Sequence, residues 1–239
     1  PRSTGLAIMI SVPLWLSNPH DCSYLADKIA QSVVVSEAFV LDMPIYSRLI
    51  EQGFRRSGDQ VYAPHCPACQ ACVPSRIAVA DFQPNRKQKR CWQRNQDTQV
   101  TIKPAKFEAE HFQLYQRYQA ERHDRTDNQQ ISENEYIEFL SSNWCNTWFV
   151  EFKINHQLAA VAIVDVLDNA LSAVYTFFDP IFAQYSPGVF AVLWQIEHAK
   201  YLNLEYVYLG FWIKDCRKML YKNQYQPLQG LINQQWQAI

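Results

Sequence analysis

The sequence predicts an α+β fold in which a smaller, cysteine-containing N-terminal region precedes a larger region built on an antiparallel sheet. Between Thr147 and Phe178, three runs rich in apolar and β-branched residues are separated by short polar turns, which is typical of a meander of three strands. On both sides of the meander, segments of helical periodicity alternate with single strands. We expect one structural region over residues 9–104 and a second over residues 105–239.

The composition excludes several classes of protein. Hydrophobic residues make up 48% and charged residues 19% of the 239 positions, which is ordinary for a globular domain. The formal net charge is −1, so any contact with nucleic acid must come from a local basic patch. No run of about 18 apolar residues is present, and the apolar stretch from Leu6 to Leu16 is too short for a signal peptide and contains Pro13. Met9 is a candidate native start, so residues 1–8 are left out of the fold prediction.

Short strands and two helices are predicted in the N-terminal region. Val33 to Val35 predicts a strand, and a short helix is expected between Asp42, a good N-cap, and Gly53, a good C′ residue. Asn85 to Arg94 predicts a second, strongly basic helix. The surroundings of Pro104 are interpreted as a linker.

Two helices are expected before the meander. Phe107 to His123 has apolar residues on one side of a helix, and Ser132 with Glu135 predicts a capping box at the start of a second helix. The strands of the meander are expected to turn at residues 155–156 and 168–169, and the Asp-Asn pair at the second turn suits positive φ angles.

The order of elements after the meander is typical of an acyltransferase of the GNAT type. A helix is predicted from Gly188 to Lys200, then a buried strand, EYVYLGFW, and then a short helix from Asp215 to Tyr225. In that layout, the helix that opens on glycine faces the acyl donor, because its free N–H groups bind anionic or carbonyl oxygens.

Three cysteines follow one another with the spacing C-x2-C-x2-C. The thiolates of Cys66, Cys69 and Cys72 can supply three ligands of a tetrahedral metal ion, with Cys22 or His65 as the fourth. The spacing suits zinc and an iron–sulfur cluster alike, and the alternative is a loop of reduced thiols without metal. Seven cysteines without an export signal indicate a reducing compartment, and we expect the cytoplasm.

A basic run extends from Arg76 to Arg94 and contains six cations against one acid, Asp81. Such a patch suits the phosphate backbone of a nucleic acid, and Trp92 within it offers a ring that can stack on a base. The alternative is a solvated helix face.

Two further pairs of cations suggest anion binding. Arg55 and Arg56 can form a fork around a carboxylate or a phosphate, although the pair by itself favours a surface loop. Lys218 and Lys222 are four residues apart and are expected to share one face of a helix, where their charges repel each other unless an acidic group binds there.

Several longer phrases match one family. They are YSRLIEQGFRRSGDQVYAPHCPACQACVPSRIAV, NRKQKR with RNQD, RYQAERH, LSAVYTFFDP and YVYLGFWIKDCRKMLYKNQYQP. From Cys22 to Trp236 the sequence resembles the aminoacyl-tRNA–protein transferases of the N-degron pathway, and its short length is similar to that of the bacterial aspartate/glutamate leucyltransferases. The resemblance implies transfer of leucine from leucyl-tRNA to the α-amine of proteins that begin with Asp or Glu, which marks them for degradation.

The resemblance also implies roles for individual residues, without a cofactor being required for the transfer itself. The acidic side chain of the acceptor would be held by Lys218, Lys222 and either Arg55 or Arg56. The cleft would be lined, and the two substrates oriented, by Tyr175, Phe178, Tyr208 and Tyr221. A proton would be accepted by Asp179 or a water, and leucine would be selected by an apolar pocket near Met219 and Phe178. The tRNA would be bound by Arg76, Arg86, Lys87, Lys89 and Arg90. Zinc or an iron–sulfur cluster would be held by Cys22, Cys66, Cys69 and Cys72.

Two segments depart from the family pattern, and three other functions stay open. The phrase DRTDNQQISENEY replaces a glycine-containing loop, and AQYSPG stands where an arginine-containing phrase is usual. The alternatives are an arginyl-tRNA-dependent transferase and a non-catalytic protein that binds tRNA or degrons. A small-molecule acetyltransferase is disfavoured because the chain has no glycine-rich pyrophosphate loop.

Overall fold

The computed structural model describes residues 10–122 and 131–239. In the N-terminal part the elements are β1 (Leu14–Leu16), β2 (His20–Asp21), β3 (Ile29–Ala30), β4 (Ser32–Val35), α1 (Met43–Glu51), β5 (Arg55–Ser57), β6 (Gln60–Pro64), β7 (Val73–Ala78), α2 (Arg86–Arg94) and β8 (Gln99–Pro104). They are followed by α3 (Ala109–Arg122), α4 (Glu133–Leu140), β9 (Thr147–Ile154), β10 (Gln157–Val166), β11 (Ala170–Phe178), η1 (Pro180–Tyr185), α5 (Pro187–Tyr201), β12 (Tyr206–Trp212), η2 (Leu220–Gln224), β13 (Leu228–Ile232) and β14 (Gln235–Ala238).

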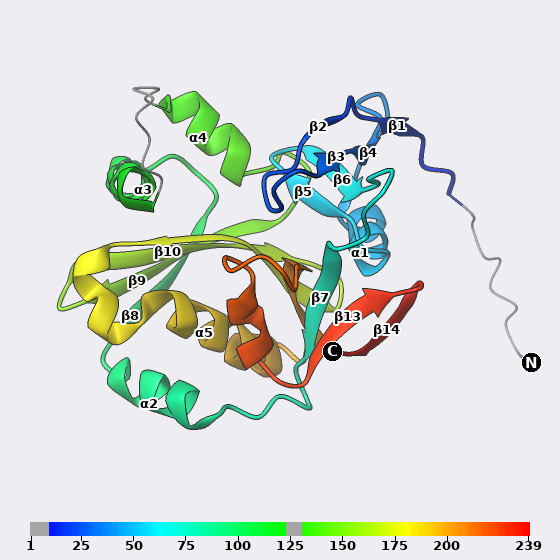
Figure 1. Cartoon of the computed structure of the whole chain (residues 1–239). Coiled ribbons are helices and arrows are strands. Elements are labelled where there is room, and N and C mark those ends of the chain that lie inside the picture. The colour runs from blue at the N-terminus through cyan, green and yellow to red at the C-terminus, as the bar shows by residue number, and fades with distance from the viewer. Residues whose placement is uncertain (1–9, 123–130) are drawn as a thin grey trace, which may run out of the picture.

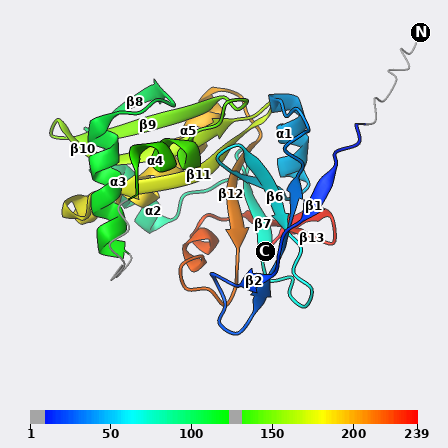
Figure 2. The same ribbon diagram turned by 90° about the horizontal axis from the view of Figure 1, so that it is seen from above.

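An eight-stranded sheet forms the centre of the molecule, in the order β14-β13-β7-β12-β11-β10-β9-β8 (Figure 1). A four-stranded sheet, β1-β4-β6-β5, and the ribbon β2-β3 lie beside it (Figure 2). The mixed α/β prediction is confirmed. The large sheet contains β7 and β8, which belong to the predicted N-terminal region, so it crosses the predicted boundary between residues 104 and 105. The division into two domains at that boundary stays a prediction.

Helices cover both faces of the large sheet. On one face α5 and α2 bury Phe190, Ile196 and Cys91 against alternate residues of β9 and β10, and on the other face α3 and α4 bury Leu114 and Tyr136. Because successive residues of a strand point to opposite faces, β10 has both of its sides covered. This explains why the run LAAVAIVDV is apolar almost throughout.

The meander β9-β10-β11 is antiparallel as predicted. Asn155 and His156 form its first turn with φ angles of 50° and 64°, as a two-residue hairpin requires. The second turn is closed by the Leu167 N–H, which donates to the Ala170 carbonyl at 2.9 Å. The expectation of positive φ angles in this second turn is wrong, because the described residues with positive φ do not include the Asp-Asn pair.

The predicted helix ends are confirmed at α1, α2 and α4. The Asp42 carboxylate accepts a hydrogen bond from the Ile45 N–H at 2.9 Å, and Gly53 has a φ of +93°. Ser132 and Glu135 form the predicted capping box of α4, and Asn85 forms one at the start of α2. These local signals involve neighbours in the chain, which is why the sequence reveals them.

Two predicted features differ from the structure, and the end of one predicted helix lies outside the described residues. Pro104 is the last residue of β8, an edge strand, where proline is tolerated, and does not lie in a linker. From Ile213 to Tyr225 the backbone hydrogen bonds join residues three apart, so the segment forms successive 3-10 turns in place of the predicted α-helix. The predicted end of α3 at His123 lies outside the described residues, as does most of the DRTDNQQISENEY loop.

No helix in the two described ranges is long and apolar enough to cross a membrane.

Candidate functional site

The two parallel strands at the middle of the large sheet separate after a short contact. Ala170, Leu171 and Ser172 of β11 pair with residues 206–208 of β12. Beyond that point β11 continues beside β10 to Phe178, while β12 continues beside β7. Backbone groups that face such a gap need other partners. A gap between parallel strands therefore offers a place for a ligand or for an inserted side chain.

Arg55 occupies the start of this gap. Its Nη2 donates to the Ala173 carbonyl at 3.0 Å, and its guanidinium lies 5.9 Å from the ring centre of Phe211. Gly210 has a φ of +78°, and a Cβ atom there would lie 1.3 Å from Nη1 of Arg55. Gly210 thus makes room for the arginine. Because Arg55 is half-buried, its charge sits at the edge of the gap and not deep in the core.

Arg56 has a different role from its neighbour. It is 4% exposed and forms two 2.6 Å hydrogen bonds with the buried Asp165. Its other donors reach the carbonyls of Gly58, Leu140 and Ser141 and the hydroxyl of Thr147. Burial opposes its charge, but Asp165 outweighs burial and raises the Arg56 pKa. Both the surface-loop interpretation and the proposed substrate contact of Arg56 are unsupported, because all three guanidinium nitrogens are engaged inside the protein.

Lys222 is also buried, at 4% exposure. Its Nζ donates to the carbonyl of Phe211 and lies 3.4 Å from the sulfur of Met219. Burial, with a smaller effect of Arg55, lowers the pKa of Lys222 to about 7. Lys218 is exposed, so the expected shared helix face of the two lysines is wrong. The 3-10 turns rotate Lys222 into the core, where it supports the backbone of β12 close to Arg55.

Helix α3 contacts the far end of β11. Gln119 donates to the hydroxyl of Tyr175 at 3.0 Å, and the ring of Tyr118 packs edge-on against Phe178 at 5.1 Å. Arg117 forms an ion pair with Asp179 at 3.2 Å. The structure therefore brings together three predicted residues, Tyr175, Phe178 and Asp179, and adds their partners from the RYQ phrase of α3. The phrase RYQAERH matches the family, but its sequence alone indicated no roles for Arg117, Tyr118 and Gln119.

The other two predicted tyrosines lie elsewhere. Tyr208 is buried among residues of the N-terminal region, and its hydroxyl accepts a hydrogen bond from Arg76 at 3.4 Å. Burial raises the Tyr208 pKa. Tyr221 is 49% exposed on η2. The predicted grouping of all four aromatic residues in one cleft is thus unsupported at Tyr208, whose ring packs against Trp236.

The start of α5 lies next to Phe178 and to α2. A Cβ atom at Gly188 would lie 3.3 Å from the Phe178 ring. The helix begins one residue before the predicted Gly188, with Pro187 at its first position, where proline is favoured. Ser186 precedes it in a left-handed conformation (φ 52°) and, within the described residues, its side chain makes no capping hydrogen bond. Pro187 has no N–H, and the N–H groups of Val189 and Phe190 both donate to the Ser186 carbonyl at 3.0 Å, so the start of α5 acts on a ligand through its dipole more than through free donors.

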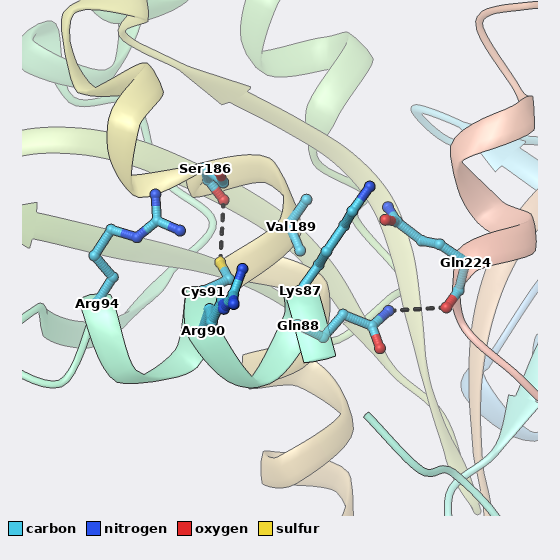
Figure 3. A pocket seen from close by; sticks show the side chains of 8 residues that line it. All are labelled: Lys87, Gln88, Arg90, Cys91, Arg94, Ser186, Val189 and Gln224. Atoms are coloured by element: carbon cyan, nitrogen blue, oxygen red, sulfur yellow. Dashed lines mark hydrogen bonds between the residues drawn. The ribbon is translucent and has the colours of Figure 1, made fainter. Parts of the chain in front are cut away.

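A cavity of about 280 Å³ separates α2 from the start of α5 (Figure 3). Its lining consists of Lys87, Gln88, Arg90, Cys91, Arg94, Ser186, Val189 and Gln224. Three of these side chains carry positive charge, and the positive end of the α5 dipole adds to them. Arg94 also donates to the carbonyl of Gln184, which ties the end of α2 to the turn before α5. This is an electropositive cavity suited to a phosphate group.

The predicted basic residues fall into two groups. Arg86, Lys87, Lys89 and Arg90 are exposed on α2, as a phosphate contact requires. Arg76 instead lies on β7 at 6% exposure, with its guanidinium 3.7 Å from the ring centre of Tyr206 and 4.2 Å from that of Trp236. The predicted contact of Arg76 with tRNA is therefore unsupported, because two rings cover the charge.

The four predicted metal ligands lie in one neighbourhood. Burial, with smaller contributions from the charges of Cys66, Cys22 and Cys69, raises the Cys72 pKa to about 11. Four thiols that repel one another when ionised are chemically suited to a thiophilic cation. In the described residues, however, no three of the sulfurs lie within 4.8 Å of one another, which is wider than a closed zinc site with Zn–S bonds of about 2.3 Å. Thiol donors suit zinc or an iron–sulfur cluster, but the four sulfurs lie farther apart than they would in a closed zinc site.

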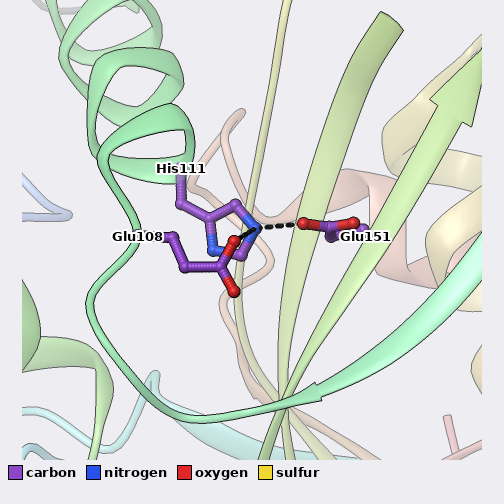
Figure 4. Close-up of side chains that lie close together, drawn as sticks. All are labelled: Glu108, His111 and Glu151. Atoms are coloured by element: carbon purple, nitrogen blue, oxygen red, sulfur yellow. Dashed lines mark hydrogen bonds and ion pairs between the residues drawn. The ribbon is translucent and has the colours of Figure 1, made fainter. Parts of the chain in front are cut away.

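One group of potential ligands was not predicted from the sequence. Glu108, His111 and Glu151 place their ligand atoms within 4.8 Å of one another (Figure 4). The Nζ of Lys103, however, lies 2.7 Å from the carboxylates of both glutamates. Lys103 thus bridges the two carboxylates, and the Nζ of Lys153 also lies 3.6 Å from Glu151, so the group is an internal ion-pair network between α3 and the sheet.

Comparisons with known proteins agree with the sequence resemblance. Residues 20–90 and 110–232 match the family models described as "Arginine-tRNA-protein transferase, N terminus" and "C terminus". An aspartate/glutamate leucyltransferase of Pseudomonas fluorescens is 49% identical over 223 residues, which are 93% of this chain and 94% of that protein. The Pseudomonas aeruginosa PAO1 protein of the same name is 45% identical over 94% of this chain and 96% of its own length.

Similarity to solved structures is weaker. The structure of L-PGS from Bacillus licheniformis has a TM-score of 0.44 and 9% identity, over 60% of this chain and 46% of that one, and it supports no argument about function. The sequence relatives define the protein as an aminoacyltransferase. The chain belongs to the arginine-tRNA-protein transferase family.

Proposed function

We propose that the protein transfers leucine from leucyl-tRNA to the N-terminal α-amine of polypeptides that begin with Asp or Glu. The observation that carries this proposal is Arg55, a half-buried guanidinium at the gap between β11 and β12, in a chain whose relatives are named aspartate/glutamate leucyltransferases. A guanidinium at such a position suits the carboxylate of an acidic residue at the polypeptide N-terminus.

The chemistry needs positioning more than activation. The neutral α-amine attacks the ester carbonyl of leucyl-tRNA, an amide bond forms, and the ester bond to the terminal ribose breaks. The amine loses one proton and the ribose oxygen gains one. Because an aminoacyl ester is already reactive, holding the two substrates together supplies much of the rate enhancement. In this scheme Tyr175, fixed by Gln119, orients the substrates.

Asp179 or a water molecule is proposed to accept the proton from the amine. Arg117 forms an ion pair with one carboxylate oxygen of Asp179, and the Ile181 N–H donates to the other oxygen at 3.2 Å. Phe178 and Met219 are proposed to select the apolar leucine side chain, and Arg55 the acidic acceptor. The exposed Lys218 and Tyr221 are proposed to contact the acceptor polypeptide at the rim, while Lys222 supports β12 from inside.

The tRNA is proposed to lie across α2, whose five basic residues all face solvent. The cavity beside the start of α5 suits a phosphate near the aminoacylated end. In this arrangement β9 to β12 and α5 would form a GNAT-like acyltransferase domain. The many reduced cysteines favour action in the cytoplasm.

Cys22, Cys66, Cys69 and Cys72 are proposed to hold zinc or an iron–sulfur cluster. Bound there, the metal would brace the loop that leads from β6 into β7 and so into the large sheet. No step of the transfer reaction needs this group, because the ester is activated already and the proton is accepted by an oxygen.

The test is a transfer assay with matched donors and acceptors. Leucyl-tRNA and arginyl-tRNA carrying labelled amino acids are each incubated with the protein and with peptides that begin with Asp, Glu or Ala. We expect label from leucyl-tRNA on the Asp and Glu peptides. Transfer from arginyl-tRNA alone would support the arginyl alternative, and tRNA binding without transfer from either donor would support a non-catalytic binding protein.

A further inference from the structure

A second and larger cavity lies on the opposite face of α2. Its volume is about 420 Å³, and its lining consists of Phe82, Pro84, Gln88, Lys89, Trp92, Gln93, Gln96, Leu193 and Glu197. The first cavity uses helix positions 87, 91 and 94, and the second uses 89, 92 and 93. At 3.6 residues per turn these sets face in opposite directions, and Gln88 lines both cavities. We call the second cavity the Trp92 groove.

The walls of the Trp92 groove are apolar and aromatic. Trp92 is 36% exposed, and its ring centre lies 5.4 Å from that of Phe190, so the indole is supported from α5 while part of it stays open. Phe82 is buried beneath the groove, and Leu193 closes it from α5. A supported and partly exposed indole in an apolar slot is a surface on which a flat ring can stack.

The rim of the groove is polar in a way that suits a nucleobase. Gln93 and Gln96 carry amides that both donate and accept hydrogen bonds, and Glu197 accepts. Such groups read the edges of an unpaired base. The Glu197 carboxylate is already paired with Lys200, whose Nζ lies 2.8 Å from Oε1, so the two glutamine amides carry the edge contacts and the phosphates are left to the basic residues outside the slot.

The charge around the groove identifies the class of ligand. Helix α2 carries five cations and no acid in nine residues, all of the cations facing solvent. A slot for a flat ring, within a strip of cations, matches a single-stranded nucleic acid better than a polypeptide. The strip continues over α2 into the electropositive cavity at the start of α5, which is the end close to Phe178.

We propose that the Trp92 groove binds one unpaired base of the single-stranded 3′ end of the donor tRNA, while the neighbouring phosphates contact the cations of α2. This inference rests on the proposed use of a tRNA donor. The aminoacylated nucleotide lies toward the start of α5, and the base held by Trp92 lies upstream of it. From Val189 to Leu193 the helix advances about 6 Å, so the two cavities are close enough for one strand to cross α2 between them.

The test compares two RNA hairpins that share the sequence of the acceptor stem. One hairpin has a four-nucleotide single-stranded 3′ tail and the other is blunt, and both are labelled at the loop for fluorescence anisotropy. Trp92→Ala is expected to weaken binding of the tailed hairpin by about 5- to 150-fold, as loss of one stacked base does. Binding of the blunt hairpin is expected to change less than about twofold, because phosphate contacts remain.

Two further variants act as controls. Trp92→Phe keeps an aromatic ring and is expected to retain most of the preference for the tail. Trp15→Ala removes a more exposed tryptophan from β1, in the four-stranded sheet, and is expected to change neither affinity. Lys89→Ala is expected to weaken both hairpins and to reduce the salt dependence of binding by about one counterion. Thermal unfolding of each variant checks that the fold is intact.

The possible failures are distinguishable. If Trp92→Ala weakens both hairpins equally, or neither, while the wild type still transfers leucine, the base-binding inference is overturned and the proposed function stands. If the wild type binds neither hairpin, the inference is overturned as well. If the wild type binds the tailed hairpin but transfers no leucine from leucyl-tRNA, the proposed function fails. Binding of the two hairpins by Trp92→Ala and Trp92→Phe then decides whether the groove holds an unpaired base.

Discussion

Arg56 and Arg55 are adjacent in the chain, but their substitution should have opposite consequences. Arg56→Ala leaves Asp165 buried at 0% side-chain exposure without its partner. Breaking a buried ion pair from one side costs about 3–5 kcal/mol. Carbonyl oxygens of α4 and its C-terminal end also lose their donor. Since domains of this kind are stable by only about 5–15 kcal/mol, Arg56→Ala should unfold at a temperature at least about 6 °C lower.

Arg55→Ala removes a half-buried side chain with one hydrogen bond to the Ala173 carbonyl. That bond contributes about 0.5–1.5 kcal/mol, so the variant should fold with modest loss of stability. It should nevertheless lose most of its transfer to Asp and Glu peptides, because the guanidinium that suits their carboxylate is gone. Urea unfolding followed by tryptophan fluorescence gives both free energies of unfolding, and peptide labelling gives both activities.

The double variant Arg56→Met/Asp165→Leu sharpens this test. It removes both charges together, so it should recover a large part of the stability lost in Arg56→Ala. Wild-type stability of Arg56→Ala, or unfolding of Arg55→Ala in its place, would refute the buried role of Arg56. A folded Arg55→Ala protein that labels acidic peptides at the wild-type rate would remove Arg55 from the site.

Three further predictions concern other parts of the molecule. Gly210→Ala places a methyl group on Arg55 and should lower both activity and unfolding temperature, whereas Gly53→Ala, whose Cβ atom would meet Pro74 at 3.0 Å and not Arg55, should lower the unfolding temperature while the folded protein keeps its activity. Burial opposes ionisation of Glu151, but Lys103 and His111 outweigh it and lower its pKa. Its stabilisation is therefore present above pH about 4.3 and is lost below it, so the wild type should lose more unfolding free energy than Glu151→Gln on acidification. Metal analysis of aerobically and anaerobically purified protein should find zinc or iron that Cys72→Ser loses, and finding neither would contradict the metal proposal.

Features that depend on neighbouring residues could be predicted from the sequence. The N-cap at Asp42, the C′ glycine at Gly53 and the capping box of α4 each involve residues within a few positions. The capping box of α2, formed by Asn85 and Gln88, is equally local but was not predicted. The meander was predicted from its three apolar, β-branched runs and from the polar turns between them. The exposed basic residues of α2 were also recognisable, because a helix with five cations and no acid cannot bury all of its faces.

Features that depend on distant partners could not be predicted. Arg56 and Asp165 are 109 positions apart, and composition does not distinguish a buried arginine from its exposed neighbour. Arg76 is covered by Tyr206 and Trp236 only because β7 lies between β12 and β13. Lys222 became buried because its segment folds as 3-10 turns, and a choice between helix types over so few residues is made by tertiary packing.

The transfer assay tests the proposed function most directly. Purified protein is incubated with leucyl-tRNA carrying labelled leucine and with three peptides that differ only in their first residue, Asp, Glu or Ala. The proposed function predicts that labelled leucine appears on the α-amine of the Asp and Glu peptides, that the Ala peptide stays unlabelled, and that Arg55→Ala abolishes the difference. Equal labelling of all three peptides, or labelling of none, would contradict it.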